Sequence, residues 1–394
     1  MTRKSYFFPL MWLCLLVYLP SSQAATVGAA SCSQTDVQNA INSAHSGDTI
    51  NVPGGSCTWG SGVTTSSSVA ITLNGGGNTT ISGTLTLNPT ASAETRVTGF
   101  NFTANNGVVT TGSTSTSAFR VDHNNFTGGG TMLQASGNAP GLIDNNKFTG
   151  NAAAEMIHNT GLGASSAAGW SDSVTPGGPN MLFIEDNTFT FNATGNPAYF
   201  FGTSAIQSYY GARTVFRHNT LNNCQVDQHG TAGMIGARWW EIYDNTFTVA
   251  ANGNQSNYMA LRDGSGVVFD NHVTNPSSNG ASGTIELTED ATSGSYPLNY
   301  QVGLGVNEAK SPAYLWGNDS SMTVGSGSSF VQAGRDYFVS SSKPSSLSRN
   351  QLTSDSSSTT YSYTPYTYPH PLQNGTTASG NNPDPPSNLE AAVQ

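Results

Sequence analysis

A short segment centred on an asparagine recurs along this chain, and the repeat constrains the fold more than any other feature. It occurs as FRVDHNNFT at 119–127, GLIDNNKFT at 141–149, LFIEDNTFT at 182–190, TVFRHNTLN at 214–222, WEIYDNTFT at 240–248, VVFDNHVT at 267–274 and AYLWGN at 313–318. The aligned asparagines are Asn124, Asn146, Asn187, Asn219, Asn245, Asn271 and Asn318. Their gaps of 22 and 26 residues match one solenoid coil. The gaps of 32, 41 and 47 residues indicate coils with inserted loops, or two coils of which one is degenerate.

A second apolar segment precedes each repeat, so the coils contain several short strands. These segments are TMLQAS at 131–136, EMIHNT at 155–160, SAIQSY at 204–209, AGMIGA at 232–237, NYMALR at 257–262 and GTIELT at 283–288. Three short strands per turn predict an all-β fold, a single-stranded right-handed parallel β-helix. Stacked coils lie about 4.8 Å apart, so one asparagine per coil can bond its amide to the next in a ladder. We therefore interpret the repeat as structural.

The two ends of the chain differ in composition from its middle. Residues 1–24 read as a cleaved secretory signal, because Arg3 and Lys4 precede an apolar core that ends before Ser22-Gln23-Ala24. We expect export to the periplasm, cell surface or medium. Beyond this signal no apolar run is long enough to span a membrane. The predicted units are a signal at 1–24, an N-terminal cap at 25–60, the β-helix at 61–338, a C-terminal segment packing on it at 339–373, and a flexible tail at 374–394.

Charge is sparse and acidic. Charged residues make up 9 % of the chain, and Gly, Ser, Thr and Asn are abundant, as suits a solenoid with many turns. Without Arg3 and Lys4 the mature chain keeps 11 basic against 23 acidic side chains. This balance argues against nucleic acid, which rewards clustered Lys and Arg. We expect a monomer.

Cysteine spacing and helical periodicity both point to a small unit before the first coil. Cys32 and Cys57 bracket this unit, and export makes a disulfide between them the expectation, with buried thiols as the alternative. Cys224 is left over and is expected to be a buried apolar residue. Between the two cysteines Val37, Ala40, Ile41 and Ala44 recur at helical spacing behind Thr35 as N-cap. Such a helix would cover the open end of a solenoid.

Several segments together resemble a known group of proteins. The cap SCSQTDVQNAINSAHSGDTINVPGGSCTW, the asparagine repeat, the run GARWWEIYDNTF and the C-terminal RDYF and YTPYTYPHPL are similar to secreted bacterial proteins of the pectate-lyase-like right-handed β-helix superfamily. The resemblance covers about residues 28–373. It implies the β-helix fold and a polysaccharide partner. The superfamily includes polysaccharide lyases with Lys or Arg bases, glycoside hydrolases with paired carboxylates, and adhesins; neither catalytic set is matched here residue by residue.

Outward positions on the strand before each repeat supply the candidate site. They include Gln134, His158, Gln207, Arg262 and Glu286. Arg238 and the loop residues Asp227 and His229 would join them from the same side of neighbouring coils. Lyase chemistry on a uronate needs a cation at the carboxylate and a base for the adjacent proton. Arg238 or Arg262 suits the first role and His229 or His158 the second, with Asp227 and Glu286 in support. The alternatives are ion pairs of each arginine with Glu241 or Asp263, and hydrogen-bonded loop histidines.

Other functions stay open at this point. Hydrolysis needs two carboxyls roughly 5–9.5 Å apart, and Asp227, Asp263 and Glu286 are the best candidates. Stacked carboxylates and carbonyls could also bind Ca²⁺, although no dense acidic loop is present. A third alternative is a non-catalytic surface protein that binds glycan along the solenoid. Uneven loops between Asn187 and Asn271 favour a localised site, so we predict an enzyme, and among enzymes a lyase for an acidic polysaccharide.

A second outward column stands two residues before the ladder asparagines. It contains Asp122, Asp144, Glu185, Arg217, Tyr243, Phe269 and Trp316. The aromatic members, with Tyr243 and Trp316 as candidates for substrate binding, could stack on sugar rings. Alternatively the C-terminal segment covers them, and its own tyrosines, too many to leave in water, favour this reading.

Overall fold

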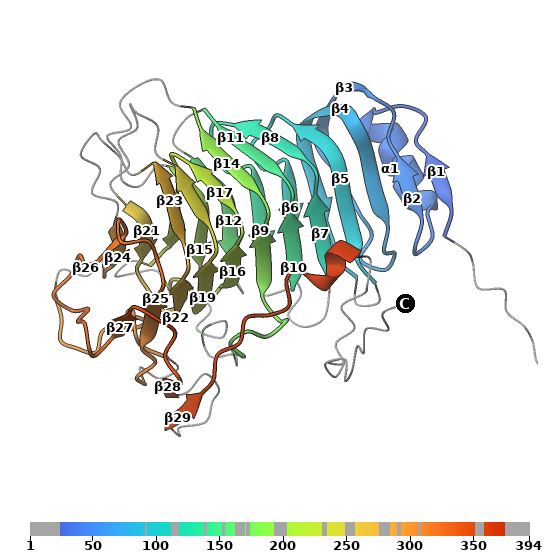
Figure 1. The fold of residues 1–394 in the computed structure, drawn as a ribbon. Helices are drawn as coiled ribbons and strands as arrows, with labels where there is room; N and C mark the ends of the chain where they lie inside the picture. The colour runs from blue at the N-terminus through green and yellow to red at the C-terminus, as the bar shows by residue number, and fades with distance from the viewer. Residues whose placement is uncertain are drawn as a thin grey trace, which may run out of the picture.

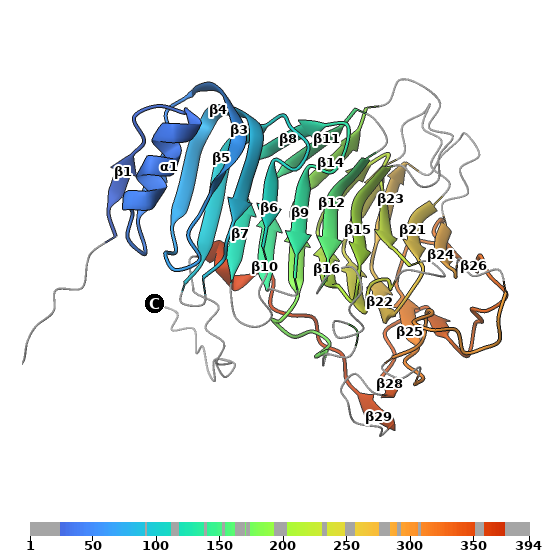
Figure 2. The same ribbon diagram turned by 180° about the vertical axis from the view of Figure 1, so that it is seen from behind.

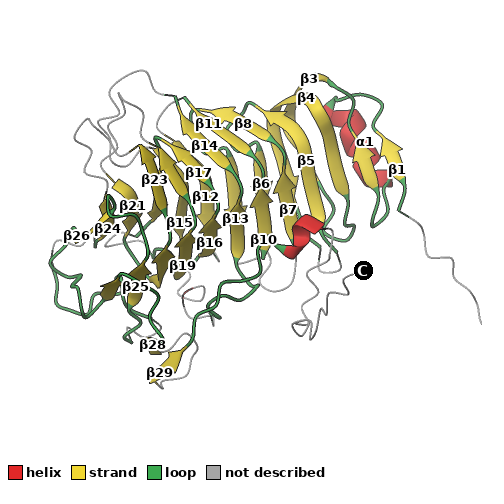
Figure 3. Ribbon diagram, viewed as in Figure 1, coloured by secondary structure: helices red, strands yellow, loops and turns green. Residues whose placement is uncertain are grey.

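The computed structural model describes residues 24–90, 93–111, 118–137, 140–151, 154–161, 170, 174–192, 203–230, 235–248, 257–275, 284–289, 293–305, 309–350 and 358–374. In these ranges strands dominate, as Figure 3 shows, and no helix is long and apolar enough to cross a membrane. The predicted signal lies outside the described residues except for Ala24, and the predicted tail lies outside them except for Asn374.

The strands build three parallel faces that run the length of the molecule (Figure 1). The first face contains β1 (Thr26–Gly28), β2 (Thr49–Asn51), the first parts of β4 (Thr72–Leu87) and β5 (Thr95–Phe102), β7 (Phe119–Asp122), β10 (Gly141–Asp144), β13 (Leu182–Glu185), β16 (Arg213–Arg217), β19 (Trp239–Tyr243), β22 (Ser265–Phe269), β25 (Ala313–Trp316) and β27 (Tyr337–Ser340). Every pairing between these strands is parallel.

The same long strands continue into the other two faces. The second face contains the first part of β3 (Gly55–Thr64), the middle of β4, the end of β5, β8 (Asn125–Gly128), β11 (Lys147–Gly150), β14 (Thr188–Phe191), β17 (Thr220–Asn222), β20 (Thr246–Thr248) and β23 (His272–Asn275). The third contains the ends of β3 and β4, β6 (Val108–Thr110), β9 (Leu133–Ser136), β12 (Ala154–Thr160), β15 (Thr203–Tyr209), β18 (Gln225–Gln228), β21 (Asn257–Leu261), β24 (Thr284–Leu287) and β26 (Thr323–Ser326). The fold is therefore the predicted right-handed parallel β-helix.

One strand assignment was wrong. The third-face strand before WEIYDNTFT is β18, not the predicted AGMIGA at 232–237, part of which lies outside the described residues. Asp227 consequently lies on a strand of the third face and not in a loop. An antiparallel pair of β28 (Leu347–Asn350) and β29 (Ser358–Tyr361) stands apart from the three faces.

Helix α1 (Gln34–Ser43) lies at the N-terminal end of the stack, beside β1 to β3 (blue in Figure 1). Its N-cap is Ser33, whose hydroxyl accepts a hydrogen bond from the Asp36 N–H, so the predicted cap at Thr35 was two residues too late. The predicted apolar positions of the helix are buried in the core. The Cys32–Cys57 disulfide is confirmed, with the two Cα atoms 5.9 Å apart.

The asparagines of the repeat form a continuous ladder, as predicted. Each Oδ1 accepts hydrogen bonds from the main-chain N–H and the side-chain amide of the preceding asparagine, at 2.8–3.2 Å, from Asn124 through to Asn318. The residue before each ladder asparagine has a φ between 49° and 65°. Short polar side chains and glycine tolerate this left-handed conformation, which turns the chain from the first face to the second.

Aromatic rings stack inside the second face, one per coil. Phe102, Phe126, Phe148 and Phe189 lie with successive ring centroids 5.2, 4.7 and 4.9 Å apart. These side chains are buried, and the stack shares the core with the apolar residues of the other two faces. The ladder and the ring stack together set the register of every coil, and therefore the position of the outward side chains.

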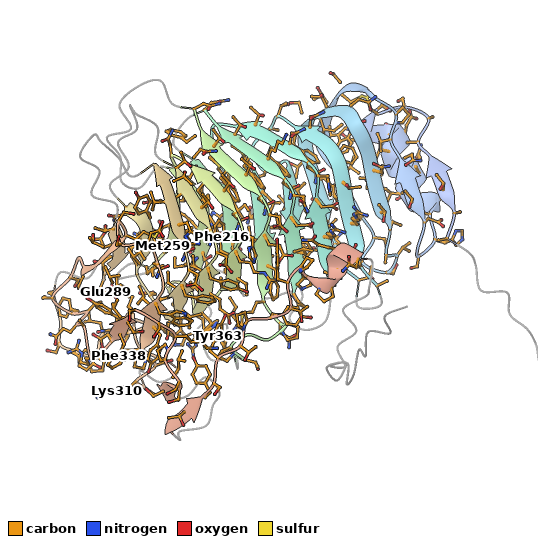
Figure 4. All side chains as sticks on the ribbon, viewed as in Figure 1. Phe216, Met259, Glu289, Lys310, Phe338 and Tyr363 are labelled. Carbon is orange, nitrogen blue, oxygen red and sulfur yellow. A yellow bond between two sulfur atoms is a disulfide. The ribbon has the colours of Figure 1, made fainter. Side chains whose placement is uncertain are left out.

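Residues 361–374, which we call the strap, lie along the outer surface of the first face (Figure 1). Arg217 donates to the carbonyls of Tyr366 and Thr367 at 2.6 and 2.9 Å. Arg120 donates to the carbonyl of Leu372 at 3.1 Å, where the strap forms the 3-10 helix η2 (Pro371–Asn374). Tyr363, labelled in Figure 4, is buried where the strap crosses the later coils.

Candidate functional site

Outward side chains of the third face line up in columns across successive coils, because the strands are in register. One column consists of Gln134, His158, Gln207, Asp227, Ala260 and Glu286. Two residues further along each strand, the next outward column contains Thr160 and Tyr209. Figure 2 shows the strands that carry these columns, β9, β12 and β15, side by side. Most of the predicted site residues are therefore neighbours.

Asp227, Arg262 and His229 form one connected group. Arg262 Nη2 donates to Asp227 Oδ2 at 2.6 Å, and the same nitrogen contacts His229 Nδ1. Asp227 and Arg262 are buried, whereas the His229 side chain is 16 % exposed. Because a guanidinium can only donate, Nδ1 of His229 must accept, which leaves the imidazole proton on Nε2. The alternative predicted for Arg262, an ion pair with a nearby carboxylate, is therefore present, with Asp227 as a partner that had not been named for it.

His158, Glu155 and Tyr209 form a second group on the two preceding coils. His158 Nδ1 lies 2.8 Å from Glu155 Oε2, which is an ion-pair distance, although no hydrogen bond from the described residues reaches that buried oxygen. The single proton of the Tyr209 hydroxyl has two acceptors within reach, Glu155 Oε1 at 3.1 Å and Gln207 Oε1. The negative charge of the nearby carboxylate favours the tautomer of His158 with its proton on Nδ1, and Nε2 then keeps its lone pair. The His158 side chain is 28 % exposed, so that lone pair belongs to a ring that solvent reaches.

Tyr209 links the two groups. Its ring lies against His158 on one side, with centroids 4.7 Å apart, and against His229 on the other, at 4.5 Å. Burial raises the pKa of Tyr209, and the charges of Glu155 and Asp227 raise it further, so the phenol is protonated at neutral pH. Sequence reasoning missed Tyr209 and Glu155. In SAIQSY the signal was present, because Tyr209 shares the outward parity of Gln207. In EMIHNT it was not, because Glu155 stands three residues before His158 and strict alternation would turn it inward.

Arg238 lies elsewhere. It is fully buried at the corner before β19, where its Nε donates to the carbonyl of Trp170 at 3.1 Å and its guanidinium lies 5.2 Å from the Trp170 ring. Trp170 in turn donates to the carbonyl of Gly305 at 3.2 Å. A side chain in this position does not face solvent. The predicted role of Arg238 in holding a substrate carboxylate is therefore not supported by its placement, and we leave it out of the site.

The carboxyls considered for hydrolysis are poorly placed for that role. Asp227 and Glu286 share a column but are two coils apart, with Ala260 between them. Asp227 is buried against Arg262, and Glu286 accepts a hydrogen bond from Asn257. Asp263 is buried and accepts from the Gly236 N–H at 2.7 Å. Each of these three carboxyls is therefore engaged by another group of the protein, which does not favour their acting as the acid and base of hydrolysis.

Tyr243 and Trp316 lie under the strap and are not available to a sugar, so their proposed role in substrate binding is corrected. Tyr243, Phe269 and Trp316 stack in sequence, with centroids 4.4 and 4.6 Å apart, and Tyr363 packs edge-on against Phe269 and Trp316. Trp316 is 5 % exposed and Tyr243 is 2 % exposed. The alternative that the C-terminal segment covers this column is the one the structure shows.

No three His, Cys, Asp or Glu side chains among the described residues are gathered closely enough to hold a metal ion. Calcium binding stays an untested prediction. The described groups can instead take part in proton transfer. Tyr209 is protonated, His158 and His229 differ in which ring nitrogen faces a partner, and the Arg262–Asp227 pair fixes His229. This arrangement suits acid–base chemistry on a ligand that lies along the third face.

Comparison with known proteins supports no close relationship. No family model matches the chain, and no curated protein matches it. Among solved structures, an alginate lyase from Paenibacillus sp. str. FPU-7 overlaps 80 % of this chain and 95 % of its own, with 13 % identity and a TM-score of 0.38. A mannuronic acid specific polysaccharide family 6 lyase from human gut microbiota overlaps 79 % of both chains, with 14 % identity and a TM-score of 0.40. Such low values say nothing of substrate or mechanism here.

Proposed function

We propose that this protein is a polysaccharide lyase that cleaves an acidic polysaccharide by β-elimination on the outer surface of the third face. The observation that carries the proposal is the placement of His158, Tyr209 and His229 on three successive coils, with the Tyr209 ring in contact with both imidazoles. In this proposal His158 Nε2 is the acceptor and His229 Nε2–H is one donor. The Tyr209 hydroxyl is the other donor, and its proton leaves Glu155 or Gln207 to reach the sugar. Elimination requires one acceptor and two donors around the reacting sugar.

The roles follow from these assignments. His158 Nε2 removes the proton from the carbon beside the substrate carboxylate, and the electron pair forms a carbon–carbon double bond as the bond to the leaving oxygen breaks. The Tyr209 hydroxyl gives its proton to that oxygen. The proton on Nε2 of His158 then leaves to solvent and the tyrosinate takes a proton from solvent, which restores the resting state, while Glu155 lies beside both residues. His229 Nε2–H donates to the substrate carboxylate.

Arg262 and Asp227 act as positioning residues. Arg262 holds Nδ1 of His229 as an acceptor, and Asp227 holds Arg262 in place. The cation behind the imidazole strengthens the Nε2–H donor toward a carboxylate, which stabilises the negative charge that develops there during proton removal. The buried pair is nearly neutral as a unit, so its contribution is orientation and polarisation of His229 and not attraction of the substrate over distance.

The proposal is tested with single variants of the full mature chain. His158→Ala and Tyr209→Phe should each lower the rate of formation of unsaturated product by about 10²–10⁴-fold. The matched control is His272→Ala, because His272 is an exposed histidine on the second face beside Asp319. Its activity should equal that of the wild type. Activity of His158→Ala and Tyr209→Phe equal to the control, with unchanged melting temperatures, would refute the assignment.

A further inference from the structure

The charges along the third face point to a particular class of acidic polysaccharide. The third-face strands from β6 to β26 carry Glu155, Asp227 and Glu286 among their described residues, and neither lysine nor arginine. Arg262, directly after β21, is already paired with Asp227. The surface along which a glycan would lie therefore carries more acidic than basic side chains. The proposed donor for a substrate carboxylate on this surface is His229, beside the Arg262–Asp227 pair.

The length of a sugar, compared with the spacing of the coils, shows which acidic side chains a bound polysaccharide would meet. A pyranose in an extended polysaccharide is about as long as the spacing of roughly 4.8 Å between coils. A chain lying along the axis therefore places about one sugar on each coil. Gln134 faces the sugar on the side of the earlier coils, and Glu286 faces the sugar two coils beyond Asp227. A uronate on every sugar would place one carboxylate close to Glu286.

Salt does not remove that conflict. The Debye length is about 8 Å at physiological ionic strength, longer than the distance between neighbouring coils. Like charges on the same or the next coil therefore keep roughly half of their unscreened repulsion. A neutral sugar at the Glu286 coil meets only a hydrogen-bond acceptor. Gln134 is a neutral amide that can both donate hydrogen bonds to sugar hydroxyls and accept them.

We infer that the substrate is a heteropolysaccharide in which a uronate is flanked by neutral sugars, and not a homopolymer of uronates. This inference rests on the proposed elimination and specifies its substrate. The single uronate binds at His229 and is cleaved there. The neighbouring neutral sugars bind through hydroxyl groups to Gln134 on one side and to the Glu286–Asn257 pair on the other.

The test compares two polymer classes with the wild-type chain and Glu286→Gln. The probes are polymannuronate and polygalacturonate as homopolymers, and gellan and xanthan as polymers with one uronate per several sugars. Initial rates of unsaturated product should favour the second class by at least about tenfold at low salt. Added NaCl and Glu286→Gln should both narrow this ratio, because each weakens the repulsion of the homopolymer. Gln134→Glu, which adds a carboxylate on the opposite side, should widen it.

The outcomes are distinguishable. Faster cleavage of the homopolymers would overturn this inference and leave elimination standing. A preference for the heteropolymers that does not change with salt, Glu286→Gln or Gln134→Glu would also overturn it, because charge would not be its cause. No unsaturated product from any polymer would overturn the proposed function itself, and this inference with it.

Discussion

Replacing Asn245 with alanine should cost far more stability than its size suggests, because the side chain holds three coils together. Its Nδ2 donates to the carbonyls of Phe216 and Tyr243 and to Asn271 Oδ1, at 2.9–3.0 Å. Its Oδ1 accepts from the main-chain and side-chain amides of Asn219, at 3.0 and 3.1 Å. Asn245 is fully buried, so water cannot replace these partners.

The magnitude follows from the groups left without a partner. A buried donor or acceptor without a hydrogen bond costs about 1–3 kcal/mol, and several of the five partners keep one other bond. We therefore expect Asn245→Ala to lower the free energy of unfolding by about 3–4 kcal/mol. Asn318→Ala is the matched control at the end of the ladder. It loses three hydrogen bonds at a half-buried site, where water can enter, and should cost about 1 kcal/mol.

Urea denaturation followed by far-ultraviolet circular dichroism measures both variants against the wild type. The two free energies should differ by at least about 2 kcal/mol. If Asn245→Ala loses no more than Asn318→Ala, the ladder does not carry the stacking of the coils, and the reasoning that derives the outward columns from it fails. A change in the slope of the transition would instead indicate that part of the solenoid unfolds separately.

Three further changes test other parts of the structure. His370 is buried against Phe183, and burial, reinforced by the charges of Arg217 and Arg120, lowers the pKa of His370 to about 3, so the melting temperature should fall as pH drops from about 6.5 toward 3. His370→Asn keeps an acceptor for the Leu372 N–H and should flatten the profile of melting temperature against pH. An unchanged profile would contradict the assignment. Burial raises the pKa of Glu94 to about 7, so ionisation of Glu94 should lower the melting temperature as pH rises from about 4.5 to 7. Glu94→Gln should remove this decrease in melting temperature. A steeper decrease in the variant would refute the role of Glu94. Arg238→Ala should lower the melting temperature clearly, because the guanidinium packs on Trp170 beneath the surface; full stability with lost turnover would instead return Arg238 to the catalytic site.

The repeat predicted the fold because each ladder asparagine bonds to its neighbours along the stack, so the determining contacts recur in the sequence. The turns before these asparagines have the same local cause, since His123 and Asp186 are residue types that adopt positive φ. The disulfide was predictable for a similar reason, as Cys32 and Cys57 bracket one short unit. In each case the pattern and the contact lie within one coil or two.

The site was predicted only in part, because its contacts cross coils at side chains that do not repeat. Strand alternation placed His158 and Gln207 near one another, whereas Asp227 and His229 were assigned to a loop of a neighbouring coil. The burial of Arg238 depends on Trp170, 68 residues away, and nothing in either segment indicates the contact. The tyrosines of the C-terminal segment indicated that it packs on the β-helix. The hydrogen bonds of Arg217 to main-chain carbonyls of the strap could not be predicted, because every residue has such a carbonyl.

The measurement that tests the central claim most directly is product analysis with the mature wild-type protein on acidic polysaccharides. Ultraviolet absorbance of the unsaturated sugar and the yield of reducing ends are followed in the same reaction. The account predicts that both signals rise together, in equal molar amounts, and that Tyr209→Phe slows both equally. Reducing ends without unsaturated product would mean hydrolysis and would contradict elimination, as would the absence of both signals across the polymers tested.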